Sequence, residues 1–483
     1  MEWTIKNYIN GKFKSPVEDQ WASNIDPARN KPIGKVPLSN TKDVENAIIS
    51  AERAFPAWSN TTAEHRSEIL RRIAQEIKNQ LETLAEAESI DNGKPITLAR
   101  KIDIPRAASN FNFFADAITQ FDTKAHEMYA AKAINLSLRH PHGVVACISP
   151  WNLPLYLFTW KIAPALATGN CVVAKPSEIT PLTAYLLSRI CEKVGLPAGV
   201  LNIVHGHGDQ AGDALIKHKL VKAITFTGGT ATGKTIASSA SPQFKKLSLE
   251  MGGKNPNIIF KDCDYDKMLE TTIRSSFANQ GQICLCGSRI FIERPIYERF
   301  KSDFLKKIDQ LKIGNPLDEN VDFGALVSAE HLKKVEGYCD MARKDEQADI
   351  IYGGKRIKVK DLEDGFYFSP TVIEVRSNQC VINQEEIFGP VVSFMPFDTE
   401  DEVLELANDS PYGLSASVWT TNINKAMRCG QRLESGVIWI NTWLKRDLRT
   451  PFGGMKSSGM GREGGLDALH FFTETKNICI DYN

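Results

Sequence analysis

The sequence GVVACISPWNLPLYLFTWKIAPALATGNCVVAK, residues 143–175, holds two short apolar runs at residues 144–148 and 171–174. A longer apolar segment, residues 155–166, lies between them. The runs have the length of strands and the segment between them has the length of a helix. Apolar strands joined by a crossover helix are typical of a parallel sheet covered on both faces. This stretch therefore predicts an α/β fold.

The alternation of strand and helix continues along the chain in two series. In the first series we expect further strands at residues 200–204 and 223–226, and the second series covers residues 257–441. The glycine-rich sequence EMGGKNP, residues 250–256, lies between the two series. We therefore predict two doubly wound parallel-sheet domains, in which nucleotides bind beyond the carboxyl ends of the strands.

The region before residue 143 is expected to contribute mainly helices. Over residues 63–89, Ile69, Ile73 and Ile77 recur at the spacing of one helical face, which predicts a single amphipathic helix. Gly93 is expected to end it, because glycine and the proline that follows shortly after cannot continue the hydrogen-bond ladder.

Two extended segments remain, at residues 127–139 and 476–482. Apolar and polar side chains alternate in both, which predicts exposed or edge strands. Either they form a surface hairpin, or another subunit covers their edges as a small β oligomerisation domain.

Composition excludes several classes of protein. The 483 residues suffice for two or three domains, and 58 basic against 58 acidic residues give zero formal charge, which excludes a general nucleic-acid binder. The ten cysteines do not form a dense disulfide framework, so we expect a cytoplasmic protein. Residues 143–160 carry no charge, but the prolines and the asparagine among them argue against a membrane span.

One short motif suggests nucleotide hydrolysis. The sequence GGTATGKT, residues 228–235, satisfies the phosphate-loop pattern and follows a predicted strand. Glycines between a strand and a helix let backbone N–H groups reach any phosphate, so the motif predicts pyrophosphate binding more broadly. A phosphate-loop NTPase remains the distant alternative.

Two residues have the character of catalytic groups. Cys284 lies in a loop after a predicted helix, where a thiol can face a cleft. Cys286 is expected to be a packing residue, and the C-x-C pair lacks the further ligands that zinc needs, so no metal site is predicted. Glu250 follows a strand in apolar and glycine-rich surroundings, where desolvation would raise its pKa and suit it as a general base.

Seven motifs occur in the order seen in NAD(P)-dependent aldehyde dehydrogenases, and the chain resembles that family over nearly its whole length. They are residues 148–154, 175–178, 226–230, 249–254, 277–284, 385–390 and 451–459. Within the family, residues 441–454 and Gly229, where many relatives carry serine, are most similar to the 2-hydroxymuconic and 2-aminomuconic semialdehyde dehydrogenase group.

The resemblance implies a mechanism for three residues. The Cys284 thiolate would attack the aldehyde, while the Asn152 side chain and the Cys284 N–H stabilise the oxyanion. Hydride would pass to NAD and leave a thioester, which Glu250 would hydrolyse by activating water.

The resemblance also implies which residues bind NAD. The expected cofactor-binding residues are Ile148, Ser149, Pro150, Trp151, Lys175, Ser177, Glu178, Gly208, Phe226, Gly228, Gly229, Glu386 and Phe388. Glu178 would accept hydrogen bonds from the ribose hydroxyls and repel a 2′-phosphate, which favours NAD over NADP.

For the substrate, the resemblance implies a carboxylate-bearing semialdehyde such as 2-aminomuconic or 2-hydroxymuconic semialdehyde. Arg106 and Arg446 would bind the carboxylate, in a pocket with Trp160, Trp443 and Phe452. Alternatively, either arginine is a surface ion-pair partner of Asp103 or Asp447. Arg449 is then the reserve candidate for binding the carboxylate. Another aldehyde (betaine, aliphatic or aromatic) is the alternative substrate.

The same resemblance implies the domain organisation. Residues 1–120 and 142–252 would form a Rossmann-like NAD-binding domain, residues 253–447 the catalytic domain, and residues 121–141 and 465–483 the oligomerisation strands of a homodimer or homotetramer. Its setting would be tryptophan or aromatic-ring catabolism.

Overall fold

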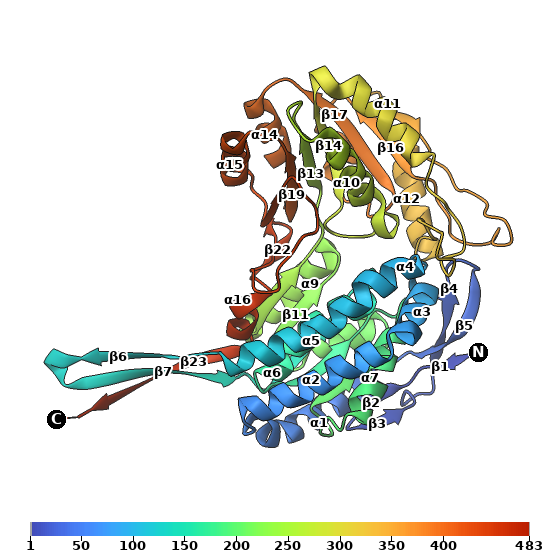
Figure 1. The fold of residues 1–483 in the computed structure, drawn as a ribbon. Helices are drawn as coiled ribbons and strands as arrows, with labels where there is room; N and C mark the ends of the chain where they lie inside the picture. Colours follow the sequence, from blue (N-terminus) through green and yellow to red (C-terminus); the bar gives the residue numbers. More distant parts are fainter. Residues whose placement is uncertain (1, 483) are drawn as a thin grey trace.

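The computed structural model describes residues 2–482 and has two lobes with a long arm (Figure 1). The first lobe is built on an eight-stranded sheet. Its strands, in spatial order, are β22 (Gly459–Met460), β12 (Lys246–Glu250), β11 (Val221–Thr227), β8 (Val144–Ile148), β9 (Cys171–Lys175), β10 (Leu201–Ile203), β2 (Asn7–Ile9) and β3 (Lys12–Lys14). The helices of this part of the chain are α1 (Thr41–Ser59), α2 (Ala63–Asn79), α3 (Leu81–Asn92), α4 (Ile96–Leu98), α5 (Ile104–Thr119), α6 (Pro154–Ala167), α7 (Leu182–Lys193), α8 (Asp213–Lys217) and α9 (Thr230–Ala240).

The central strands of this sheet are parallel and doubly wound. From β8 the chain proceeds outward through β9 and β10 on one side, and through β11 and β12 on the other. The direction of winding therefore reverses between β8 and β11, and a ligand is expected beyond the carboxyl ends of strands at such a reversal.

The second lobe is built on a seven-stranded sheet, which is parallel except for its first edge strand. Its order is β15 (Ala348–Tyr352), β16 (Thr371–Val375), β17 (Val391–Phe397), β14 (Gly287–Glu293), β13 (Asn255–Ile259), β19 (Ser415–Trp419) and β20 (Val437–Ile440). Its helices are α10 (Tyr265–Phe277), α11 (Tyr297–Ile308), α12 (Ala329–Ala342), α13 (Val381–Gln384), α14 (Glu400–Asn408) and α15 (Ile423–Arg432). The fold prediction of two doubly wound domains is confirmed.

The connection between the sheets places one edge of each against the other. β12 ends at Glu250 and β13 begins at Asn255, so only four residues separate them. The carboxyl edge of the first sheet consequently faces the amino edge of the second, and residues at these two edges are brought together.

The predicted helix over residues 63–89 is two helices. α2 ends at Asn79 and α3 begins at Leu81, because Gln80 between them leaves the helical conformation with φ −105° and ψ 23°. The apolar periodicity continues across Gln80, which is why it gave no sign of the break. Gly93 does end α3, in the left-handed conformation with φ 86°.

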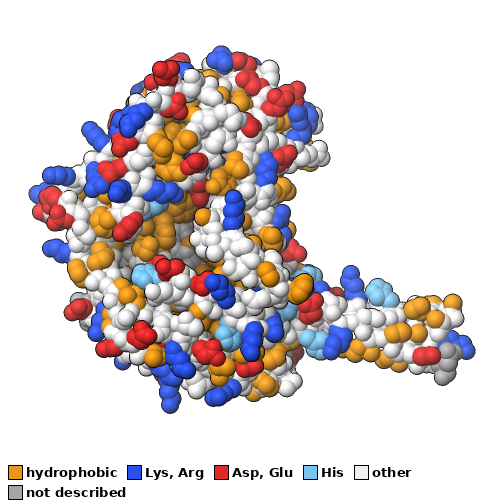
Figure 2. Space-filling view, turned by 180° about the vertical axis from the view of Figure 1, so that it is seen from behind, with side chains coloured by type: hydrophobic (Ala, Val, Ile, Leu, Met, Phe, Trp, Pro, Cys, Tyr) orange, Lys and Arg blue, Asp and Glu red, His pale blue; other side chains and the backbone are white. Residues whose placement is uncertain are grey.

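The arm is a three-stranded antiparallel sheet of β6 (Lys124–Met128), β7 (Ala133–Pro141) and β23 (Thr473–Asp481). The single strand expected over residues 127–139 is a hairpin, which reverses through a short 3₁₀ turn, Tyr129–Ala131. Hydrophobic side chains are visible on its surface in Figure 2. The exposed large hydrophobic residues of the arm include Met128, Tyr129, Ile478 and Ile480.

The remaining elements are short. They are β1 (Trp3–Thr4), β4 (Trp21–Asp26) and β5 (Lys31–Pro37), which form a small sheet, the paired strands β18 (Tyr412–Gly413) and β21 (Met455–Lys456), and α16 (Gly465–Phe471) before the arm. Within residues 2–482, no helix is both long and apolar enough to cross a membrane.

Candidate active site

Cys284 lies on a tightly constrained loop between α10 and β14. Asn279, Gln280 and Gly281 all have φ values between 51° and 70°, in the left-handed region. A Cβ on Gly281 would lie 2.1 Å from the carbonyl oxygen of Gly389, so only glycine fits there. The Asn255 side chain donates to the carbonyl oxygens of Cys284 (2.7 Å) and of Cys286 (2.8 Å). The thiol is therefore held on a rigid support.

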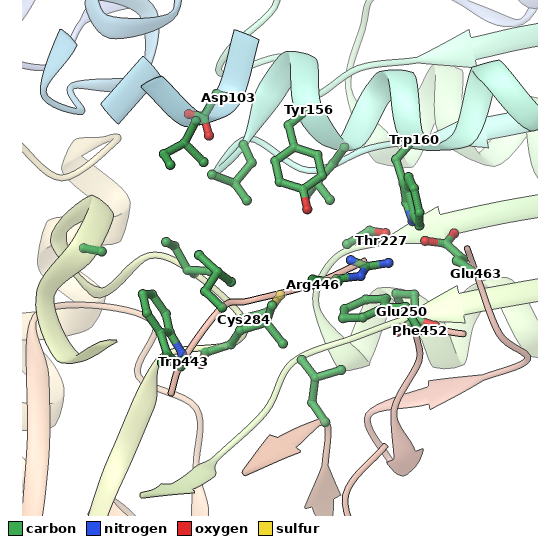
Figure 3. Close-up of a pocket in the computed structure, with 18 of the residues that line it drawn as sticks. Asp103, Tyr156, Trp160, Thr227, Glu250, Cys284, Trp443, Arg446, Phe452 and Glu463 are labelled. Atoms are coloured by element: carbon green, nitrogen blue, oxygen red, sulfur yellow. Dashed lines mark hydrogen bonds between the residues drawn. The ribbon is translucent and has the colours of Figure 1, made fainter. Parts of the chain in front are cut away.

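Two cavities meet at Cys284. The first has a volume of about 310 Å³ and mainly apolar walls (Figure 3). The second has a volume of about 210 Å³ and lies beside the loop after β8. Both are lined by Thr227, Met251 and Cys284. Burial raises the pKa of the Cys284 thiol, and nearby Glu386 and Glu250 raise it further, so a nearby base is needed to generate the thiolate.

Glu250 is the last residue of β12 and lines the first cavity. Its side chain is buried, and neither carboxylate oxygen has a hydrogen-bond partner among residues 2–482. Burial raises the pKa of Glu250 well above its usual value, and the nearby Glu463 adds to the shift. An unpaired carboxyl with a raised pKa is suited to accept a proton.

Asn152 and Cys284 both line the second cavity. Asn152 follows β8, and its buried Nδ2 donates to the carbonyl oxygen of Gln282 at 2.9 Å, in the loop that carries the thiol. Asn152, Glu250 and Cys284, which lie far apart in the sequence, therefore come together around the junction of the cavities.

The nicotinamide-side candidates line the second cavity. Trp151 packs edge-on against Phe388, with ring centroids 5.3 Å apart. The Glu386 carboxylate accepts a hydrogen bond from the Gly253 N–H at 2.9 Å, and burial raises its pKa. A Cβ on Gly252 would lie 2.0 Å from Glu386 Oε2, so a larger residue there would displace the Glu386 carboxylate. Pro150 also lines this cavity.

Gly228 and Gly229 connect β11 to α9 at the reversal point of the first sheet. Gly229 caps α9 and also lines the second cavity, and a Cβ on it would contact nothing within 4 Å. Buried hydroxyls of Ser149 and Thr227 have no partner in the described part of the chain. A helix N-terminus with open space and free hydroxyl groups fits a pyrophosphate.

The adenosine-side candidates lie outside the two cavities, along the carboxyl ends of neighbouring strands. Lys175 ends β9, and its Nζ lies 3.2 Å from Glu178 Oε2. Burial raises the pKa of Glu178, but Lys175 and hydrogen bonds outweigh burial and hold it below its usual value, so the carboxylate stays charged. Ser177 is buried beside it. Gly208 begins a π-helical turn, Gly208–Gly212, and a Cβ on it would contact nothing.

Two further expected residues support this site from within the sheet. Ile148 and Phe226 are buried at the carboxyl ends of β8 and β11. A Cβ on Gly228 would lie 2.4 Å from the Phe226 ring. Neither lines a cavity wall, so both are placed to support the glycine turn.

Arg446, Trp160, Trp443 and Phe452 line the first cavity, as expected of a substrate pocket. The Arg446 guanidinium carbon lies 3.8 Å from the Phe452 ring centroid and 4.6 Å from that of Trp160. Its Nε and Nη2 are buried without a partner within residues 2–482. Burial lowers the pKa of Arg446. A buried guanidinium without a carboxylate partner is suited to an anionic ligand.

Arg106 does not line the cavity. Its guanidinium carbon lies 5.5 Å from the Tyr156 ring and 5.9 Å from the Trp160 ring, and both rings do line the cavity. Its Nε and Nη2 are likewise buried and lack a partner in the described chain. Arg106 therefore contacts aromatic side chains that line the cavity, whereas Arg446 lines the cavity itself.

The alternative of surface ion pairs for these arginines is wrong. Asp103 pairs with Lys94 at 2.5 Å, and Asp447 pairs with Arg449 at 2.7 Å. The Arg449 side chain is 81% exposed, so it is the surface arginine of this region.

Several residues around the cavities escaped sequence reasoning. Glu463 lines the first cavity and accepts from Lys161 Nζ at 2.6 Å. His331 and Lys334 line the second, and His331 Nε2 lies 2.7 Å from the carbonyl oxygen of Phe388. Only Lys161 is indicated by the sequence, because it is the single charged residue in an otherwise apolar helix. Glu463, His331 and Lys334 lie in sequence segments with other polar residues, where nothing distinguishes them.

The phosphate-loop pattern does not have phosphate-loop geometry. α9 begins at Thr230, so the second half of the pattern is already helical. Lys234 is exposed on α9 and lines neither cavity. The NTPase interpretation is therefore wrong, and the glycines alone take part in the site. Among residues 2–482, no group of three or more His, Cys, Asp and Glu residues could hold a metal ion.

Comparison with known proteins agrees with this geometry. Residues 14–478 match the model of the aldehyde dehydrogenase family. The chain belongs to this family. It is therefore an oxidoreductase that acts on aldehydes, as the seven motifs predicted.

Relatives with assigned activities indicate which group within the family this chain resembles. The chain is 47% identical over 480 residues to a 2-aminomuconic semialdehyde dehydrogenase of Danio rerio, covering 99% of this chain and 98% of the relative. It is 45% identical over 482 residues to a 2-hydroxymuconic semialdehyde dehydrogenase of Pseudomonas sp. (strain CF600), covering 99% of each. The resemblance to the muconic semialdehyde group is therefore confirmed.

Solved structures share the fold. A putative aldehyde dehydrogenase from Burkholderia cenocepacia superimposes with a TM-score of 0.97 at 38% identity, covering 99% of this chain and 97% of that one. A betaine aldehyde dehydrogenase from Staphylococcus aureus in complex with NAD+ has a TM-score of 0.96 at 38% identity, covering 99% and 94%.

Proposed function

We propose that this aldehyde dehydrogenase uses NAD to oxidise a semialdehyde that bears a carboxylate, of the 2-aminomuconic or 2-hydroxymuconic class. The observation that carries the proposal is the unpaired guanidinium of Arg446 in the apolar cavity that also contains Cys284. An apolar wall suits the unsaturated carbon chain, and the guanidinium suits the carboxylate at its far end. The names of the relatives support the same substrate class.

The alternative substrates fit this cavity less well. A betaine aldehyde carries a permanent positive charge, which would lie close to the Arg446 guanidinium. A neutral aliphatic or aromatic aldehyde would leave that guanidinium buried and unpaired, at a cost of a few kcal/mol.

Chemistry begins with the thiol. Glu250 takes the proton of Cys284 directly or through water, and Sγ forms a bond to the aldehyde carbon while the carbonyl electron pair moves to oxygen. The Asn152 Nδ2 and the Cys284 N–H donate to that oxyanion. Collapse of the oxyanion restores the carbonyl and expels hydride, which leaves a Cys284 thioester.

The NAD that this site fits supplies the acceptor for the hydride. For it, Glu386 and Phe388 would hold the nicotinamide end, Gly228 and Gly229 the pyrophosphate, and Lys175 and Glu178 the adenosine ribose. The other proposed contacts are Ile148, Ser149, Pro150, Trp151, Ser177, Gly208 and Phe226. The charged state of Glu178 favours NAD over NADP, because a 2′-phosphate would be repelled.

Hydrolysis of the thioester completes the cycle. Glu250 first releases to solvent the proton that it took from Cys284. It then takes a proton from water as the water oxygen attacks the thioester carbon, and the C–S bond breaks to release the carboxylic acid and the Cys284 thiolate, which regains its proton from Glu250. Neither Glu250 carboxylate oxygen has a hydrogen-bond partner within residues 2–482, so either oxygen can accept the proton.

The same proposal includes the assembly and location of the protein. The proposed division places residues 1–120 with 142–252 in the NAD-binding domain, 253–447 in the catalytic domain, and 121–141 with 465–483 in the oligomerisation strands. The separate strands of the second sheet and of the arm support it, whereas β22 extends the first sheet from outside these ranges. Exposed apolar side chains of the arm would be covered in a homodimer or homotetramer. A cytoplasmic location suits ten cysteines that are all free.

A substrate panel tests the proposal. NADH formation is expected to be most efficient with 2-aminomuconic or 2-hydroxymuconic semialdehyde, with kcat/KM about 10²-fold or more above that of a neutral or cationic aldehyde. NADH absorbance gives the rates. Equal or better kcat/KM with acetaldehyde, benzaldehyde or betaine aldehyde would refute the substrate class while leaving the family assignment intact.

The role of Glu250 gives a pH-dependent prediction. A general base acts in its ionised form, and the raised pKa of Glu250 moves ionisation toward higher pH. Thioester hydrolysis by the wild type should therefore accelerate as pH rises through that pKa. Glu250→Gln should be about 10²-fold slower and lose this rise. Single-turnover release of the acid across neutral to alkaline pH measures both, and an unchanged profile in the variant would exclude Glu250 as the base.

A further inference from the structure

Three charged side chains form a buried cluster beside the loop that carries Asn152. Glu88, Lys94 and Asp103 have side chains that are 0% exposed. Lys94 Nζ lies 2.5 Å from Asp103 Oδ2 and 3.4 Å from Glu88 Oε1. The desolvation cost of burying three charged groups is offset only in part by their mutual attraction, so the cluster is not explained by a contribution to stability alone.

The cluster holds the loop between β8 and α6 at two points. Lys94 Nζ donates to the backbone oxygen of Asn152 at 3.0 Å. Glu88 Oε2 accepts from the N–H of Leu155 at 3.2 Å. Asn152, in the loop, and Leu155, in the first turn of α6, are therefore both held by buried side chains of the cluster.

From the other direction, Asn152 is tied to the thiol loop. Asn279 Nδ2 donates to the same backbone oxygen of Asn152 at 2.9 Å, and the Asn152 side chain donates to Gln282 at 2.9 Å. The backbone oxygen of Asn152 thus receives two donors, one from Lys94 and one from the loop of Cys284. Loss of the Lys94 donor would leave this backbone oxygen with the single donor from the thiol loop.

We infer that Lys94 is a positioning residue, which fixes the Asn152 amide relative to Cys284 through the backbone oxygen of Asn152. The inference rests on the proposed role of Asn152 as oxyanion donor. A hydrogen-bond donor stabilises a developing charge strongly only when it is already in place, and a small displacement weakens catalysis without preventing substrate binding. Lys94 lines neither cavity, but its partner Asp103 lines the first one. An effect that passes through Asn152 therefore has to be separated from one that passes through Asp103, which a double-mutant cycle with Asn152 does.

The test is a double-mutant cycle of Lys94→Met with Asn152→Ala. Asn152→Ala alone should lower kcat by about 10²-fold or more. Lys94→Met alone should lower kcat by about 10-fold, with the KM for NAD within about 3-fold of the wild type. In the Asn152→Ala background, Lys94→Met should cost less than about 2-fold more, because the group it positions is gone.

Lys193→Met is the matched control, since Lys193 makes its ion pair with Glu76 at the surface and is 65% exposed. It should leave kcat unchanged. If Lys94→Met fails to fold because Glu88 and Asp103 lose their partner, the variant Glu88→Gln, Lys94→Met, Asp103→Asn replaces it in the cycle, since it removes all three charges together.

The outcomes separate this inference from the proposed function. Unchanged kcat in Asn152→Ala would show that Asn152 is not an oxyanion donor, and would refute that part of the proposed function. A large loss in Asn152→Ala with an equal, additive loss from the Lys94 change in both backgrounds would show that Lys94 acts elsewhere, and would overturn the inference alone.

Discussion

Cys284→Ser is expected to lower kcat for aldehyde oxidation by about 10⁴-fold or more. The serine hydroxyl has nearly the shape of the thiol, so both cavities should persist. Its oxygen is a far weaker nucleophile, however, and even the thiol needs help to ionise, because burial raises its pKa. Steady-state NADH absorbance measures the loss, and NADH binding to the variant shows whether the cofactor site is intact.

Cys286→Ala provides the control for this experiment. Cys286 is a second free cysteine, two residues away, but its buried side chain packs among apolar residues and lines neither large cavity. Its replacement should leave kcat within about 3-fold of the wild type. If Cys284→Ser oxidises aldehyde with the kcat of the wild type, or if only the Cys286 variant loses kcat, then Cys284 is not the nucleophile.

The fold could be predicted because its signals are local. A buried parallel strand is a short apolar run, and residues 144–148 and 171–174 coincide with β8 and β9 to within one residue. The arm could be predicted only in part. Its alternation of apolar and polar side chains is clear only at Ile134, Leu136 and Leu138, after the turn at Tyr129–Ala131, and no glycine or proline marks the reversal at Lys132, whose φ is 49°.

The candidate site residues that lie in sequence motifs could be predicted, because the type of residue at a motif position indicates its chemistry. Cys284, Glu250 and Asn152 stand in motifs, and they meet at the junction of two cavities. The position of Arg106, outside the cavity lining but against Tyr156 and Trp160, could not be predicted, because it depends on how α5 packs against α6. The contact of Lys94 with Asn152 joins residues 58 positions apart, and no local pattern encodes it.

Arg446→Met tests the substrate assignment most directly. For a carboxylate-bearing semialdehyde, kcat/KM should fall by about 10²-fold, equivalent to about 3 kcal/mol, because a charge-assisted hydrogen bond in a dry cavity is lost. For a neutral aldehyde of similar size, kcat/KM should stay the same or rise, since the variant no longer buries an unpaired guanidinium. NADH absorbance with the two substrates in parallel gives both values.

Two companion variants determine how the Arg446 result is interpreted. Arg449→Met removes a guanidinium three residues away that is exposed and paired with Asp447, and should change neither substrate's kcat/KM. Arg106→Met should lower kcat/KM less than Arg446→Met, because Arg106 does not line the cavity and only contacts its Tyr156 and Trp160 walls. An equal loss for charged and neutral aldehydes in Arg446→Met would mean that the guanidinium supports the Phe452 and Trp160 walls rather than binding a carboxylate, since wall support does not distinguish the charge of the substrate.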